Sequence, residues 1–253
     1  MNKMKRIFFT RQVLFASLIS ICLFGCSPQL NYQASGEFNP IDETIQQEAE
    51  LVAFIEPYKD NMEAKMGSVI GTTQKALTRA GRESLLGNFV SDLQLEYAQE
   101  AFGYPIDISI INNGGMRNDL PEGPVTLGNI YELSPFDNFL VVLELQADDV
   151  KKLAEFIAVR KNMAFQGMRI TSENDKLAEL NIDGKDLESG KTYLLVINDY
   201  LANGGDNMEF LIGLPVKENS TTSIRDMLIT MIQQKTAAGE ILNAEIEGRL
   251  KIN

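Results

Sequence analysis

The sequence predicts one α+β domain covering roughly residues 40–253. Three observations predict this fold class. Segments with a helical period of apolar residues alternate with short apolar runs typical of buried strands. The alternation does not follow a strict strand–helix–strand repeat, and no internal sequence repeat is present. The chain has 253 residues, which is enough for one large domain or two small ones.

The first 25 residues have the composition of a lipoprotein signal peptide. A basic flank precedes an apolar run over residues 13–24, which is short for a transmembrane helix. The run ends in Leu23-Phe24-Gly25-Cys26, which resembles a bacterial lipobox and implies cleavage before Cys26 and lipidation of its thiol. The polar residues 26–40 would then form a tether. An ordinary signal peptide and an uncleaved membrane anchor are the open alternatives.

Processing at Cys26 would leave an acidic protein without a thiol, because Cys22 leaves with the leader. All 35 acidic side chains and 19 of the 23 basic ones lie beyond Cys26, so the mature net charge is −16. A surface this acidic repels nucleic-acid backbones, so we expect no nucleic-acid partner. The chain also has no histidine, which excludes a His-containing catalytic triad and any His-bearing metal site.

Residues 41–66 read as the first helix. Ile45, Ala49, Val52 and Ile55 fall near a 3.6-residue period, and acidic residues fill much of the remainder. Pro57 lies inside this stretch and should break or kink the helix.

Residues 83–102 form the clearest helix of the chain. Leu85, Phe89, Leu93 and Tyr97 recur every four residues, and Gly103 follows as a candidate C-cap. The same reasoning predicts further helices over residues 147–161 and 221–238. Strands are expected over residues 68–77, 108–111, 139–145, 168–171, 177–182, 192–197 and 243–252.

Two small-residue loops directly follow predicted buried strands. The first is Asn112-Asn113-Gly114-Gly115, which predicts a tight turn with positive φ, and Arg117 lies two residues beyond it. The second covers residues 199–206. Each loop alone is most often only a turn, and a lone arginine is most often solvated. Bare backbone amides beside an arginine nevertheless suit an anionic ligand.

Four ordered segments together resemble the C-terminal, substrate-binding domain of the 5'-nucleotidase family. They are Glu83-Ser84-Leu85-Leu86-Gly87-Asn88, Asn112-Asn113-Gly114-Gly115-Met116-Arg117, Ser134-Pro135-Phe136-Asp137-Asn138 and Asn198-Asp199-Tyr200-Leu201-Ala202-Asn203-Gly204-Gly205-Asp206. The resemblance implies a layered α/β/β/α domain over residues 67–253, with residues 41–66 matching the helix that links the family's two domains. The segment 164–169 resembles the family pattern only loosely.

The resemblance also implies roles for individual residues. Phe136 and Tyr200 match the two rings that sandwich the nucleobase, although the family more often has Phe at the second position. Asp206 matches the acid that accepts the ribose hydroxyls, and Arg117 matches a phosphate-contacting arginine. The remaining expected substrate contacts are Asn112, Gly114, Gly115, Asn138 and Arg82, with Arg79 as the alternative to Arg82.

No catalytic or metal-binding residue is expected in this chain. Family enzymes hydrolyse the phosphate ester at a two-metal centre of Asp, Asn and His in an upstream phosphoesterase domain, whereas only the leader and tether precede the first helix here. The leading expectation is therefore the nucleotide-binding half of a split 5'-nucleotidase, held at the cell envelope by lipid. Divalent metals would be needed only in a separately encoded metallophosphoesterase partner. The alternatives are a non-catalytic nucleoside- or nucleotide-binding lipoprotein and a degenerate structural module.

Overall fold

The structure is a computed structural model that describes residue 36, residues 40–42 and residues 45–253. The predicted signal peptide, most of the tether and Cys26 lie outside these residues. The chain divides into units Met1–Ala49 and Glu50–Asn253, and every strand among the described residues lies in the second unit. No helix within the described residues is long and apolar enough to cross a membrane.

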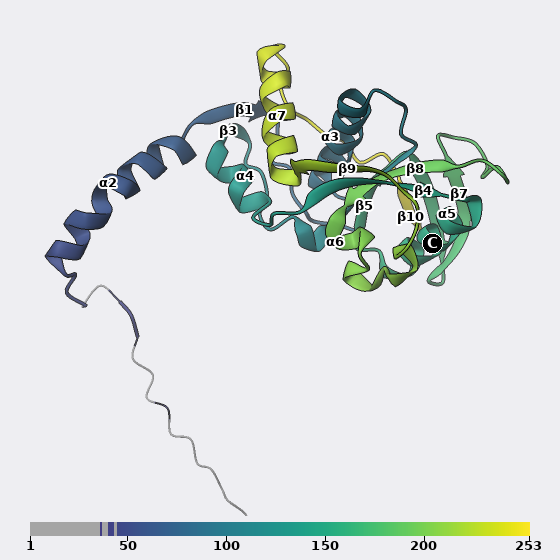
Figure 1. The fold of residues 1–253 in the computed structure, drawn as a ribbon, viewed down its shortest axis with the longest axis horizontal. Helices are drawn as coiled ribbons and strands as arrows, with labels where there is room; N and C mark the ends of the chain where they lie inside the picture. Colours follow the sequence, from purple (N-terminus) through teal and green to yellow (C-terminus); the bar gives the residue numbers. More distant parts are fainter. Residues whose placement is uncertain (1–35, 37–39, 43–44) are drawn as a thin grey trace, which may run out of the picture. The chain divides into compact units, whose positions relative to one another are not determined.

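A five-stranded mixed sheet forms the centre of the domain, in the order β5-β2-β8-β4-β9 (Figure 1). β2 (Ile108–Asn112) pairs in parallel with β8 (Tyr193–Asn198), and the other neighbours are antiparallel. The remaining strands of this sheet are β4 (Phe139–Leu145), β5 (Met163–Gln166) and β9 (Val216–Ser223). All five residues of β2 are buried, which confirms the buried strand predicted at this position.

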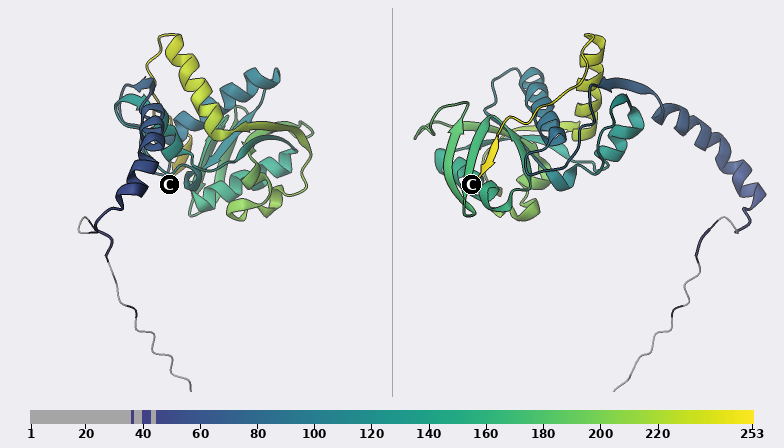
Figure 2. Two further views of the ribbon diagram at one scale, coloured as in Figure 1. Left: turned by 60° about the vertical axis from the view of Figure 1, so that its left-hand side comes forward. Right: turned by 180° about the vertical axis from the view of Figure 1, so that it is seen from behind.

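Both faces of this sheet are covered, because its strands carry apolar residues on each side. α3 (Leu85–Phe102) and α7 (Ile224–Ala237) pack on one face. α5 (Ala147–Arg160) and α6 (Asp199–Ala202) share the second core with the other face. Figures 1 and 2 show α3 and α7 on one side of the sheet and α6 on the opposite side. The predicted α+β class is confirmed.

A three-stranded sheet in the order β10-β6-β7 closes the second core. Its strands are β6 (Met168–Glu173), β7 (Lys176–Ile182) and β10 (Leu250–Ile252). A separate two-stranded ribbon pairs β1 (Val69–Thr73) with β3 (Gly123–Thr126), and α4 (Leu127–Leu133) follows it directly.

α3 shows why its sequence forms a helix with defined ends. The Ser84 hydroxyl caps its start by accepting a hydrogen bond from the Gly87 amide at 3.0 Å. Gly103 ends it in the left-handed conformation with φ of 74°, as predicted for a C-cap glycine. A Cβ at Gly87 would lie 2.6 Å from the Ala164 Cβ, so this glycine lets the helix approach β5 closely.

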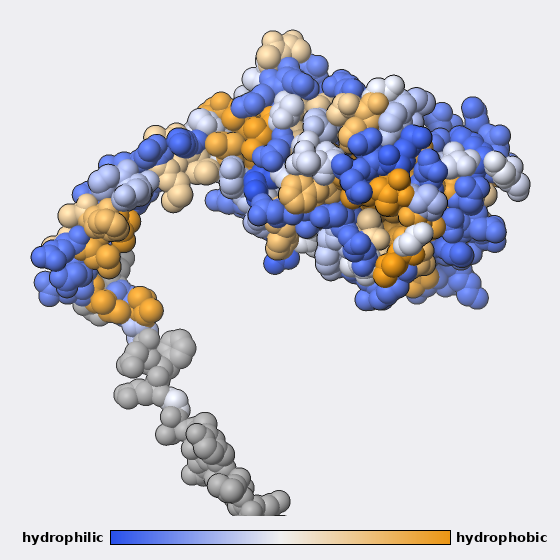
Figure 3. Space-filling view, in the orientation of Figure 1, coloured by the Kyte–Doolittle hydropathy of each residue, from blue (hydrophilic) through white to orange (hydrophobic). Residues whose placement is uncertain are grey.

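α2 (Ala49–Met66) corrects the first predicted helix, which was expected to begin at residue 41. The helix also continues past Pro57, because one missing amide in an exposed helix does not have to end it. None of its residues is buried. Leu51, Phe54, Ile55 and Tyr58 are exposed, and Figure 3 shows apolar side chains along α2 between hydrophilic ones.

Two other predicted element boundaries were wrong. The helix predicted from residue 221 begins at Ile224, because β9 continues to Ser223, whose hydroxyl then caps the helix. The strand predicted over residues 243–252 is formed only at its end, as β10. β3, β5, β9 and α4 were not predicted, and α6 forms inside residues 199–206, which were predicted to be a loop.

Arg249 is a buried charge that joins three parts of the fold. It is 1% exposed and pairs with Asp92 of α3 through two contacts, Nη1 to Oδ1 at 2.7 Å and Nη2 to Oδ2 at 2.8 Å. Its Nη1 also donates to the Phe165 carbonyl at 3.0 Å, and its Nε donates to Glu247 at 3.2 Å. Burial raises the pKa of Asp92, and the hydrogen bond from Arg249 opposes that rise.

Candidate functional site

The candidate site lies where three strand ends meet. β2 and β8 run in parallel, so the loops after Asn112 and Asn198 leave the sheet at the same edge. β4 is antiparallel to β8, with Leu140 opposite Asn198, so the segment before β4 begins at that edge as well. The edge beyond the carboxyl ends of parallel strands is a common place for ligands in open sheets.

A cavity of about 350 Å³ opens at this edge. Eight residues line it, and all eight are expected substrate contacts: Asn112, Gly114, Gly115, Arg117, Phe136, Asn138, Tyr200 and Asp206. The structure thus brings together residues that are separated by up to 94 positions in the chain, as in the contact of Asn112 with Asp206.

Arg82, the ninth expected contact, does not line this cavity. It is exposed and lies close enough to Asp175 to lower the pKa of that carboxylate, after the larger effect of Lys161. Arg79, its alternative, donates from Nε to Asp119 at 3.0 Å and from Nη1 to the Met116 carbonyl at 3.1 Å. Both Arg79 contacts are to the segment that follows Gly115, so Arg79 supports the loop from outside.

The two aromatic side chains of the cavity are unusually open to solvent. Phe136 is 44% exposed and Tyr200 is 46% exposed, whereas a ring used for core packing is buried. The Arg117 guanidinium carbon lies 5.7 Å from the centre of the Phe136 ring, in cation–π range, and its Nη1 donates to the Gly114 carbonyl at 3.3 Å. The cavity therefore offers aromatic faces beside a cation.

Asp206 is the carboxylate of the cavity, and both of its oxygens accept hydrogen bonds. Asn112 Nδ2 donates to Oδ2 at 2.7 Å, and the Tyr200 hydroxyl donates to Oδ1 at 2.9 Å. Asp206 has φ of 53°, which is uncommon for a residue with a side chain. The two donors hold the carboxylate plane in one orientation.

The glycine pair acts through close approach and not through positive φ, which corrects the predicted turn. Asn113–Gly115 forms a short 3₁₀ turn, and neither Gly114 nor Gly115 has positive φ. A Cβ at Gly115 would lie 2.7 Å from Asn112 Oδ1, whereas one at Gly114 would have ordinary contacts. Gly115 is thus the glycine that makes room for the Asn112 side chain.

Sequence reasoning missed the residues that hold the aromatic positions. Asp199 Oδ1 accepts from the amides of Phe139 at 3.1 Å and Tyr200 at 2.9 Å, so it ties together the segments that carry the two rings. Arg225 donates to the Ser134 carbonyl at 3.2 Å and to Asp137 at 2.5 Å, on either side of Phe136. Asp199 and Asp137 lie inside the quoted motifs, and nothing in the sequence connects Arg225 to them.

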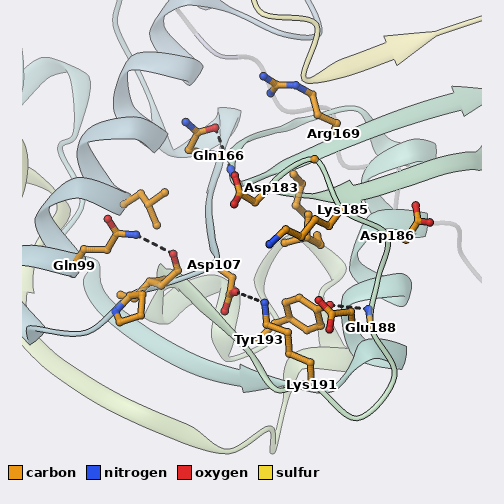
Figure 4. A pocket seen from close by; sticks show the side chains of 17 residues that line it. Gln99, Asp107, Gln166, Arg169, Asp183, Lys185, Asp186, Glu188, Lys191 and Tyr193 are labelled. Carbon is orange, nitrogen blue, oxygen red and sulfur yellow. Dashed lines mark hydrogen bonds and ion pairs between the residues drawn. The ribbon is translucent and has the colours of Figure 1, made fainter.

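A second and larger cavity, of about 690 Å³, lies apart from these strand ends. Figure 4 shows its lining, in which charges of both signs face the same space. Its one aromatic residue, Tyr193, is 1% exposed and is covered by Lys191, whose Nζ lies 4.4 Å from the ring centre. Lys191 in turn donates to Asp107 at 2.9 Å, which raises the pKa of the lysine. This lining offers no open ring for a base.

The described residues do not fit the two-metal centre of family enzymes. Such a centre needs a cluster of carboxylate and imidazole ligands. The chain contains no histidine, and no group of three or more acidic or cysteine side chains in the described part of the chain could hold a metal ion.

Curated relatives are longer proteins. The chain is 29% identical over 231 residues to Cell wall protein Lmo0130 of Listeria monocytogenes, which covers 79% of this chain and 29% of that protein. It is 25% identical over 185 residues to a 5'-nucleotidase of Vibrio vulnificus, which covers 69% of this chain and 32% of that enzyme. The chain thus spans about a third of the length of these relatives.

Solved structures with the same fold include two nucleotidases. A 5'-nucleotidase precursor from Thermus thermophilus matches with a TM-score of 0.66 at 24% identity, over 80% of this chain and 42% of that one. The NAD nucleotidase of Haemophilus influenzae matches with a TM-score of 0.60 at 19% identity, over 81% of this chain and 41% of that one. The family model for the 5'-nucleotidase C-terminal domain matches residues 69–212, which include all three strand ends of the cavity. This chain therefore belongs to the 5'-nucleotidase family through its C-terminal domain.

Proposed function

We propose that this protein binds a nucleotide at the strand-end cavity and presents its phosphate to a separate metallophosphoesterase. The observation that carries the proposal is the convergence of Phe136, Tyr200, Asp206 and Arg117 on one cavity of about 350 Å³. Open rings suit a base, an oriented carboxylate suits two ribose hydroxyls, and a guanidinium suits a phosphate dianion.

Arg117 has two uses in this arrangement. Its guanidinium lies over the Phe136 ring, where a nucleobase would stack. A base entering the cavity displaces the guanidinium from that ring, and the released side chain turns toward the phosphate. Its contact to Gly114 is 3.3 Å long and exposed, so little is lost when it moves.

The proposed partner supplies the metal ions that polarise the phosphate and activate water. One observation supports a partner: the described residues include no group of three or more acidic or cysteine side chains that could hold a metal ion. We propose that the partner contacts the exposed apolar residues of α2. Export and lipid anchoring through Cys26 also belong to this proposal, and a cell-wall protein among the relatives supports export.

AMP and adenosine binding tests the cavity. The full-length chain in mild detergent should bind both, with a Kd of roughly 10 μM to 1 mM, because stacking gives about 1–3 kcal/mol per base before the cost of association. Arg117→Ala should weaken AMP by about 1.5–3 kcal/mol, since it removes a charge-assisted contact. The same substitution should weaken adenosine binding much less. The loss of AMP affinity should become smaller as the salt concentration rises. Calorimetry measures all of these values.

Arg79→Ala is the matched control, because Arg79 is paired outside the cavity. It should leave the difference between AMP and adenosine unchanged. If Arg117→Ala weakens the binding of AMP and of adenosine equally, Arg117 has a structural role and does not contact the phosphate. No binding of either ligand at several millimolar would remove the cavity assignment.

The chain alone should release no phosphate from AMP, with or without added Mn²⁺, Zn²⁺, Co²⁺ or Mg²⁺. A cavity that orients a phosphate cannot by itself generate the hydroxide that attacks it. Proteins that co-purify from membranes with the chain should restore the release, as measured by free phosphate.

If the purified chain releases phosphate from AMP in the presence of a metal ion, and Asp206→Asn abolishes this release, the chain is itself an enzyme. Nucleotide binding without any phosphoesterase in the co-purified fraction would instead favour the non-catalytic binding protein.

A further inference from the structure

The Tyr200 hydroxyl makes two contacts to a single residue. It donates to Asp206 Oδ1 at 2.9 Å and lies 3.2 Å from the Asp206 amide nitrogen, which donates to it. One hydroxyl therefore bridges the side chain and the backbone of Asp206. A phenylalanine at this position would keep the ring and lose both contacts.

The ring that carries this hydroxyl is fixed by the loop beneath it. A Cβ at Gly205 would lie 2.5 Å from Cε1 and Cζ of Tyr200, so the ring rests against bare glycine backbone. Asp206 and Asn207 both have positive φ, of 53° and 69°, which L-residues adopt rarely and only when neighbouring contacts hold them. The hydroxyl is one of the contacts that hold Asp206 in this conformation.

The other Asp206 oxygen is held from the opposite direction. Asn112 Nδ2 donates to Oδ2 at 2.7 Å, and Asn112 is only 4% exposed. A carboxylate has about four lone-pair positions. One donor on each oxygen therefore fixes the carboxylate plane and leaves one acceptor position per oxygen for a ligand.

We propose that the Tyr200 hydroxyl is a specificity-determining group, which orients Asp206 so that it accepts both hydroxyls of a ribose. The cavity then selects ribonucleosides over deoxyribonucleosides. This inference rests on the proposed nucleotide-binding function and adds the group that orients Asp206 toward the sugar. Tyr200 has a positioning role here that is separate from stacking, because its hydroxyl acts through Asp206.

The test compares adenosine with 2'-deoxyadenosine, measured by calorimetry on the full-length chain in mild detergent. The unchanged protein should bind adenosine at least roughly ten-fold more tightly, the effect of one charge-assisted hydrogen bond. In Tyr200→Phe the binding of adenosine should weaken by roughly five- to ten-fold. The binding of 2'-deoxyadenosine should weaken less, because this ligand has only its 3'-hydroxyl to offer Asp206. The ratio of the two affinities should therefore fall.

Tyr97→Phe is the matched control. It removes a hydroxyl that bonds to Thr222 at 3.0 Å and lies outside the cavity lining, so it should change neither affinity. Tyr200→Phe with an unchanged affinity ratio would overturn the inference while leaving the proposed function intact. An equal loss of affinity for adenosine and 2'-deoxyadenosine would also overturn it, since the hydroxyl would then support the whole cavity. Failure of the unchanged protein to bind adenosine would instead contradict the proposed function itself.

Discussion

Asp206→Asn should weaken adenosine binding by at least roughly 30-fold, or about 2 kcal/mol. The carboxylate accepts from Asn112 and Tyr200, one donor on each oxygen. An asparagine amide has one oxygen and one NH₂ group, so only one of its two ends can still accept a ribose hydroxyl. It also lacks the charge that strengthens bonds to ribose hydroxyls. Calorimetry with adenosine measures the loss.

Asparagine is the informative substitution because it tolerates the left-handed backbone at this position, with φ of 53°. Asp186→Asn is the matched control, because Asp186 lines the second cavity and should not affect adenosine. Adenosine binding within three-fold of the unchanged protein would mean that Asp206 only shapes the loop.

Arg249→Met should destabilise the fold by about 3 kcal/mol, at the lower end of the cost of breaking a buried pair, because the Asp92 side chain that loses its partner is 38% exposed. Thermal or denaturant unfolding measures the change. Burial already raises the pKa of Asp92, and the variant removes the hydrogen bond that opposes this rise. The raised pKa means that folding favours protonated Asp92. The stability deficit should therefore be largest above this pKa and shrink as pH falls through it.

The double variant Arg249→Met with Asp92→Leu removes both partners. It therefore separates the stability that the ion pair contributes from the cost of leaving Asp92 charged and unpaired. It should recover much of the stability, because an apolar pair of similar volume can replace a buried ion pair. A loss below 1 kcal/mol in the single variant, or a pH-independent loss, would show that Asp92 stays solvated when Arg249 is absent.

The buried strand at β2, the strand β4 and the helix α3 could be predicted from sequence because their information is local. α3 has an apolar stripe with a serine before it and a glycine after it, and both caps form. β9 was missed because its pattern is mostly polar: it is a strand through pairing with β4, a contact that local periodicity does not encode.

The cavity residues could be named from the ordered motifs, but the contacts that hold them could not. Arg225 reaches Ser134 and Asp137 across about 90 residues of sequence, and only the packing of α7 brings it there. Arg82 was also an expected substrate contact, with Arg79 as its alternative, yet it does not line the cavity. Which residue of a loop reaches a distant site depends on the tertiary structure.

A crystal structure of the protein grown with AMP would show whether the strand-end cavity binds the nucleotide. We expect AMP at this cavity, with its base between Phe136 and Tyr200 and its two ribose hydroxyls on Asp206. Arg117 should have left the Phe136 ring, where it now lies 5.7 Å from the ring centre, and should contact the phosphate. AMP bound in the second cavity, with Arg117 still over Phe136, would show that the strand-end cavity is not the nucleotide site.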